Sequence, residues 1–93
     1  MQYITTLLIH LLGVIMKNLY FVRIDNDYLE DAKAFQTKSG AVAYFRRTAQ
    51  ELYQYGQTCT ASIHIAPRLS DVVEYPDFVL SLGERGGVHI ERA

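Results

Sequence analysis

The sequence has little of several features on which specialised proteins depend. Its nine Lys and Arg nearly balance its ten Asp and Glu, which leaves a net charge of −1. This balance argues against a dedicated DNA-binding protein, which carries a basic excess, and against an acidic mimic of DNA. The only cysteine, Cys59, cannot form a disulfide within the chain, which fits the reducing cytoplasm. The chain also has no tryptophan and only two prolines, but seven tyrosines.

The length of 93 residues limits the chain to one domain. Apolar residues make up 49% and charged residues 20%, a composition that is ordinary for a folded domain and wrong for a disordered one. A core this small supplies little stability by itself, only about 3–5 kcal/mol in chains below roughly 70–80 residues. We therefore expect a homodimer.

Residues 1–16 form an uncharged segment with three interpretations. Its large aliphatic residues share one helical face: Ile4, Leu7, Leu8, Leu11, Leu12 and Ile15. The segment is shorter than a membrane span of roughly 18–20 residues, and it lacks the cleavage site of a secretory signal. The following "MKNLYFV" is typical of a cytosolic start, so we favour Met16 as the natural start. Residues 1–15 are then an apolar helical leader and 16–93 the domain, with membrane contact expected only if the leader is retained.

The pattern from Met16 onward predicts an α+β fold. Residues 19–25 alternate as a central strand, and 28–37 fit either a short strand or a helix, of which we choose the strand. Alternating apolar residues predict further strands at 58–66, 77–82 and 88–92. The order β-(β)-α-β-β-β, with four to five strands, is satisfied by one helix covering one face of a mostly antiparallel sheet.

The helix is expected from about Ser39 to Tyr55. Thr37 or Ser39 can cap its start, and Gly56 can close its end. The residues that recur on one face predict an inward stripe: Ala41, Phe45, Ala49 and Leu52.

The run Gly83-Glu84-Arg85-Gly86-Gly87 raises the question of a phosphate site. A P-loop needs G-x-x-x-x-G-K-[ST] ahead of a helix, whereas here Val88 and Ile90 continue as a strand. A short glycine-containing loop between two strands is typical of a β-hairpin. The sequence thus predicts a turn and no cofactor.

Three arrangements resemble reactive sites. His64, His89 and Glu91 would share the sheet face away from the helix and could bind a metal ion if their strands were neighbours. Cys59 and His64 fall on opposite faces of one strand, so a buried thiol is expected. Ser62 and His64 share a face but lie about 7 Å apart along the strand, so we expect no hydroxyl–imidazole pair. We therefore expect no enzyme and no metal.

Because no reactive site is expected, we expect the function to depend on surface contacts with a partner. Partner contact is expected on the open sheet face, the outer helix face and the loops. The candidate residues are Arg46, Arg47, His64, Arg68, Tyr75, Arg85 and His89. The leading hypothesis is a non-enzymatic protein-interaction module. The alternatives are a nucleic-acid-binding regulator that uses Arg46, Arg47, Arg68 and Arg85, and a metal protein or enzyme that uses the histidines.

The segments "YGQTCTASIHIAP" and "YPDFVLSLGERGGV" resemble those of short bacterial proteins of undefined role, some carried on mobile elements or prophages. The resemblance spans residues 19–91 and carries no catalytic or ligand-binding motif. It implies a small bacterial accessory protein. An inhibitor of a host defence complex, a class of similar size, is a subordinate alternative.

Overall fold

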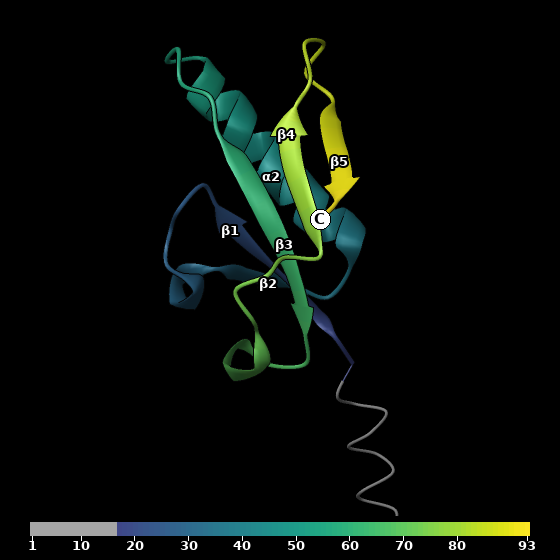
Figure 1. The fold of residues 1–93 in the computed structure, drawn as a ribbon. Coiled ribbons are helices and arrows are strands. Elements are labelled where there is room, and N and C mark those ends of the chain that lie inside the picture. Colours follow the sequence, from purple (N-terminus) through teal and green to yellow (C-terminus); the bar gives the residue numbers. More distant parts are fainter. Residues whose placement is uncertain (1–16) are drawn as a thin grey trace, which may run out of the picture.

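The computed structural model describes residues 17–93, in which one helix packs on a five-stranded antiparallel sheet (Figure 1). The predicted α+β class is confirmed, whereas the predicted helical leader lies outside the described residues. The elements in chain order are β1 (Leu19–Ile24), η1 (Leu29–Asp31), β2 (Lys33–Phe35), α2 (Lys38–Tyr53), β3 (Thr60–Ala66), η2 (Leu69–Asp71), β4 (Phe78–Leu82) and β5 (Val88–Arg92).

The strand order is β2-β1-β3-β4-β5, and every neighbouring pair is antiparallel. β1 and β3 are therefore interior strands, which agrees with the apolar residues that β1 carries on both faces. β2 and β3 both run antiparallel to β1, so α2 joins two parallel strands by crossing over the strand between them. This crossover places α2 on one face of the sheet, here called the inner face (Figure 1).

α2 begins and ends at residues that suit these positions. The Oγ1 of Thr37, at the N-cap, accepts a hydrogen bond from the Gly40 N–H at 3.0 Å. Past the helix end, Gly56 has φ +74°, a conformation that glycine adopts without steric cost. The helix thus ends at Tyr53, two residues before the predicted end, and Gly56 reverses the chain toward β3.

The core lies between α2 and the inner face. The helix contributes Ala41, Phe45 and Ala49, all fully or almost fully buried, as predicted, while Leu52, the fourth residue of the predicted stripe, is partly buried. Ile63 and Leu80 face them from β3 and β4. The alternation that predicted the inner faces of these strands is therefore confirmed, although β3 begins at Thr60 and leaves Cys59 just before it.

The ambiguous segment 28–37 holds both kinds of structure on a small scale. Leu29–Asp31 form one 3₁₀ turn and Lys33–Phe35 form the short edge strand β2, so the choice of a strand is confirmed there. The Phe35 ring packs against Tyr44 of α2, with 5.2 Å between ring centroids. This contact attaches the edge strand to the helix.

The opposite, outer face of the sheet is covered over part of its area. Residues 67–77, which connect β3 to β4 and include η2, fold back over β1 and β3. Their contacts are a hydrogen bond between His64 and Val73, and an ion pair between Arg23 and Glu74. The sequence predicted that this face would be open at Ser62 and His64. That prediction is wrong, because only 9% of Ser62 and 1% of His64 is exposed.

Candidate functional site

The glycine run forms the β4–β5 turn, as predicted. The Gly86 N–H donates to the Gly83 carbonyl at 3.0 Å, and the Gly83 N–H donates to the Gly87 carbonyl. Gly86 has φ +83°, the left-handed conformation that follows a tight turn in hairpins of this length. The next paired residues, Leu82 and Val88, open the ladder between the strands.

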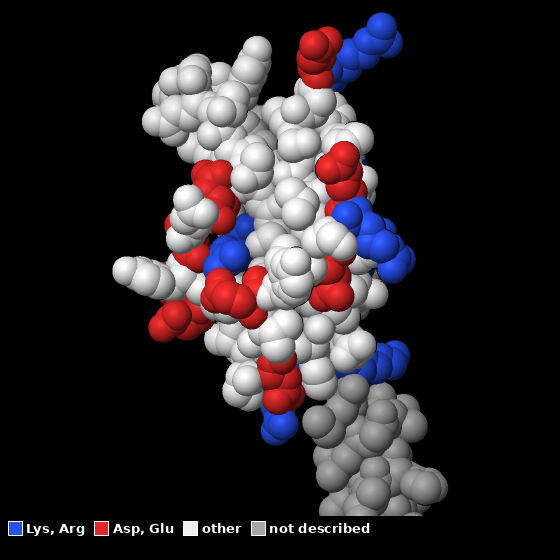
Figure 2. All heavy atoms as spheres, viewed as in Figure 1, with Lys and Arg blue, Asp and Glu red and all other residues white. Residues whose placement is uncertain are grey.

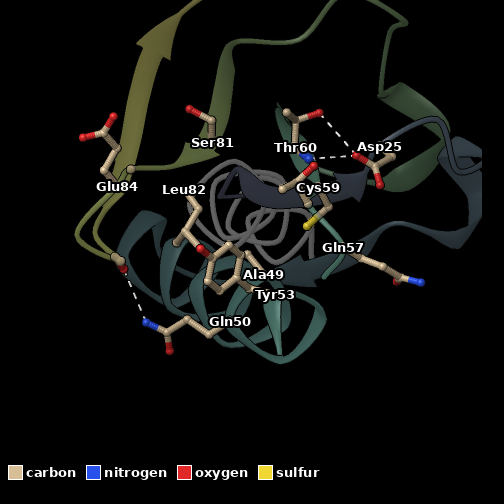
Figure 3. Close-up of a pocket in the computed structure, with 13 residues that line it drawn as sticks. Asp25, Ala49, Gln50, Tyr53, Gln57, Cys59, Thr60, Ser81, Leu82 and Glu84 are labelled. Atoms are coloured by element: carbon tan, nitrogen blue, oxygen red, sulfur yellow. Dashed lines mark hydrogen bonds between the residues drawn. The ribbon is translucent and has the colours of Figure 1, made fainter. Parts of the chain in front are cut away.

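The turn also forms one wall of a cleft of about 560 Å³, here called the fork cleft (Figure 3). β3 and β4 are paired up to Thr60 and Ser81, and beyond this pair the two chains diverge. The C-terminal end of α2 lies beneath the gap. The Gln50 Nε2 donates to the Gly86 carbonyl at 3.3 Å, which ties the helix to the turn. The cleft therefore exists because two paired strands separate over the end of a helix.

Apolar groups line the inside of the fork cleft and polar groups line its margin. Ala49 and Tyr53 of α2 and Leu82 of β4 contribute the apolar surface. Figure 3 shows the Cys59 thiol directed to the inside of this ring of side chains. Glu84 stands at the rim, on the turn. A cleft with an apolar interior and few polar groups is the usual form of a small-molecule site.

Asp25 is the most constrained polar residue of the fork cleft. Its backbone N–H donates to the Thr60 carbonyl at 2.8 Å, and its Oδ1 accepts from the Thr60 N–H at 2.7 Å. Its φ of +46° makes it the one non-glycine residue in the left-handed region among residues 17–93. Aspartate tolerates this conformation better than most residues because its short side chain can hydrogen-bond locally. The carboxylate is thereby fixed at the margin of the cleft.

The environment of the Cys59 thiol in the fork cleft disfavours its charged form. Burial, and secondarily the charge of Asp25, raise the pKa of the Cys59 thiol above its ordinary value. Cys59 is buried, as predicted, and a thiol with a raised pKa is a poor nucleophile. This residue therefore contributes surface to the cleft, in an environment that disfavours the reactive thiolate.

Ser62 and His64 form a hydrogen bond, contrary to the prediction from the sequence. Ser62 Oγ and His64 Nε2 lie 2.9 Å apart, and His64 Nδ1 lies 2.9 Å from the Val73 carbonyl. The prediction considered only the spacing of the two residues along the strand, whereas the long His64 side chain leans along the strand and reaches the Ser62 hydroxyl. Because a carbonyl only accepts, Nδ1 carries the proton and Nε2 accepts from the Ser62 hydroxyl.

The environment of His64 favours its neutral form. The pKa of His64 is lowered mainly by burial and further by the Arg23 charge, against the opposing effects of the Val73 hydrogen bond, Asp77 and Glu74. The Ser62–His64–Val73 chain resembles an activated hydroxyl, but residues 67–77 cover it and neither side chain lines the fork cleft. Its geometry supports a structural role, in which it holds the β3–β4 connection on the sheet.

The residues predicted as partner contacts lie on separate surfaces. Arg46 and Arg47 are exposed on α2, whereas Arg68 precedes η2 and Arg85 is at the β4–β5 turn. The last two lie toward opposite ends of the sheet (Figure 1). In Figure 2, which views the outer face, acidic side chains gather over the β1–β2 connection. The four arginines named for nucleic-acid binding are therefore not brought together.

Tyr75 and His89 are exposed, as expected of contact residues, while His64 is buried and cannot contact a partner in this structure. The condition set for a metal site is also not met, because β4 lies between the strands of His64 and His89. His89 Nε2 instead lies 3.3 Å from Glu91 Oε1. Within residues 17–93, no group of three His, Cys, Asp or Glu is placed to hold a metal ion.

Comparisons of the chain with protein-family models, with curated proteins and with solved structures found no match. In the part of the chain that the structure describes, no helix is both long enough and apolar enough to cross a membrane.

Proposed function

We propose that the protein is a non-enzymatic protein-interaction module whose contact is the free edge of β5. The observation that carries this proposal is that, within residues 17–93, β5 pairs with β4 on one side only, while four of its five residues are exposed. A free strand edge presents unpaired N–H and C=O groups to which an extended segment of another protein can add. The other edge strand, β2, has only three residues and offers less.

The register of the hairpin identifies the backbone groups that face outward. The Ala93 N–H donates to the Asp77 carbonyl, so these two residues form a hydrogen-bonded pair. Hydrogen-bonded and non-hydrogen-bonded pairs alternate along an antiparallel ladder. Ile90, opposite Leu80, is therefore a non-bonded residue, and its N–H and C=O point to the free edge together with those of Val88 and Arg92.

A second copy of the chain is the second candidate partner, because the sequence of β5 is self-complementary. If two β5 strands pair antiparallel with Ile90 opposite Ile90, each His89 lies opposite a Glu91 of the other copy. Light scattering on the purified protein distinguishes a dimer formed in this way from a monomer that awaits a different protein.

The alternation of the ladder provides a test that leaves the fold intact. Ile90→Pro removes an N–H that points away from β4, so the β4–β5 ladder keeps its hydrogen bonds. The matched control, Ile90→Val, keeps that N–H. Each variant is used as bait in cells of the source organism, and the bound protein is quantified by mass spectrometry after circular dichroism has confirmed folding.

We expect Ile90→Val to retain a stoichiometric partner, or a dimer, and Ile90→Pro to lose it. Equal recovery with both variants would refute the role of the β5 edge, and repeated recovery of the protein alone as a monomer would refute the proposed function. A captured subunit of a host defence complex would favour the inhibitor alternative. The single thiol, which has no disulfide partner in the chain, supports action in the cytoplasm.

A further inference from the structure

We propose that the fork cleft binds a small organic cation, namely an amine attached to an apolar body. The inference does not depend on the β5 edge, which belongs to a different part of the surface. It depends on the size of the cleft, on the sign of the charges that line it and on the way in which Asp25 is held.

The size and lining of the cleft suit a small organic molecule. Its volume of about 560 Å³ falls within the range of roughly 300–1,000 Å³ that is typical of ligand pockets. Ala49 and Leu82 offer an apolar surface, and the ring of Tyr53 lines the same side. An aromatic face attracts an organic ammonium group as well as an apolar body.

The charges that line the cleft select a cation. Of residues 17–93, the acidic Asp25 and Glu84 are among those that line the cleft, Glu84 at its rim, and no Lys, Arg or His is. Asp25 Oδ1 carries the hydrogen bonds to Thr60, which leaves Oδ2 as the oxygen available to a ligand. The hydrogen bonds from Thr60 to Oδ1 restrain the carboxylate, so little side-chain entropy is lost when Oδ2 binds a ligand.

The dipole of α2 adds to the negative electrostatic potential of the two carboxylates. The C-terminal end of α2 lies at the cleft and carries the negative end of the helix dipole, which favours cations. The last turn of α2 has no basic residue that would neutralise it. Two carboxylates and a helix C-terminus thus act in one direction, and a phosphate or a carboxylate ligand would be repelled.

The test is a titration of the ¹⁵N-labelled full chain with three probes of similar shape. These are 2-phenylethylammonium, the neutral 2-phenylethanol and the anionic phenylacetate. We expect saturable shifts of the amides of Thr60, Gly83 and Gly86 with the ammonium, at least about five-fold weaker binding of the alcohol, and no binding of the carboxylate. Equal binding of the alcohol, binding of phenylacetate, absence of ammonium binding or shifts confined to another surface would each overturn the proposal.

Asp25→Asn is the matching variant, because its side-chain oxygen can still accept from the Thr60 N–H while the charge is removed. We expect the variant to bind the ammonium about ten-fold more weakly, as for the loss of one charged hydrogen-bond partner. Asp71→Asn makes the same change of net charge in η2, at the far end of the sheet, and should leave the affinity unchanged. Equal affinities of the two variants would count against Asp25 as the site of recognition.

Discussion

Asp25 and Thr60 are joined through both their backbones and the Asp25 side chain. One hydrogen bond runs from the Asp25 N–H to the Thr60 carbonyl at 2.8 Å, and a second returns from the Thr60 N–H to Asp25 Oδ1 at 2.7 Å. A third, longer one runs from Thr60 Oγ1 to Asp25 Oδ1 at 3.4 Å. The carboxylate thus takes the place of a backbone acceptor at the point where β1 leaves the sheet. This relationship fixes the first residue of β3 and the margin of the fork cleft at the same time.

Residue 25 must supply a hydrogen-bond acceptor to the Thr60 N–H and must adopt a left-handed backbone conformation, and substitutions can separate these two requirements. Asp25→Asn keeps an acceptor for Thr60 and tolerates φ +46°, so we expect a change in the free energy of unfolding within about 0.5 kcal/mol. Asp25→Ala loses the acceptor and strains the backbone, and should cost about 2 kcal/mol. Asp25→Gly also loses the acceptor but avoids the strain, so its loss of stability should fall between those of the other two variants. Urea unfolding measures all three, and equal losses for Asn and Ala would contradict this account.

The same carboxylate should slow the chemistry of Cys59. Its charge contributes, after burial, to the raised pKa of the thiol, so removing it should lower that pKa and increase the thiolate fraction. We expect Asp25→Asn to be alkylated by iodoacetamide at pH 8 about two- to three-fold faster than the parent chain. Glu91→Gln, on β5, is the control for net charge. The alkylation rates of the same proteins unfolded in urea correct for the intrinsic reactivity of the thiol. An unchanged rate would show that the charge of Asp25 does not raise the pKa of the Cys59 thiol.

Local patterns were sufficient to predict the helix and the strands of the fold, although residues 28–37 were ambiguous and the 3₁₀ turns η1 and η2 were not expected. The spacing of Ala41, Phe45 and Ala49 specifies one buried stripe, and the alternation around Ile63 specifies one buried strand face. Both patterns report short-range geometry with a fixed period, which a single sequence reveals. The Gly83–Gly87 turn was predicted for the same reason, because the conformation that it requires is local.

The features that the sequence did not predict depend on contacts between distant segments. Val73 and Glu74 contact His64 and Arg23 on the outer face of the sheet. No periodic pattern in residues 67–77 indicates that this connection folds back over the sheet. The fork cleft likewise joins the ends of β1, α2, β3 and β4. The only local signal of Asp25 was its place beside Asn26 and Asp27, which mark a turn but do not show which residue takes the left-handed conformation.

Neighbouring glycines in the β4–β5 turn should respond differently to alanine. Gly86 has φ +83°, where alanine is strained, so Gly86→Ala should destabilise the protein by about 1–2 kcal/mol. At Gly87 an added Cβ would meet nothing within 4 Å, and its φ lies outside the positive region. Gly87→Ala should therefore be neutral or stabilising by up to about 1 kcal/mol, because it restricts the unfolded chain. Thermal unfolding measures the stability of both variants. Equal losses of stability would mean that the turn has a different conformation.

The covered outer face should make stability depend on pH through His64. Burial lowers its pKa below 6.5, so between 6.5 and the folded value the unfolded chain binds a proton that the folded protein does not. The contribution of His64 is therefore fully present above pH 6.5 and is lost as the pH falls, with a slope of at most about 1.4 kcal/mol per pH unit. Urea unfolding from pH 7.5 to 5.5 measures this slope before most carboxylates titrate. His64→Gln should flatten it, and the same substitution at exposed His89 should not. If His64→Gln keeps the slope of the parent chain, the neutral imidazole between Ser62 and Val73 is not what holds residues 67–77 on the sheet.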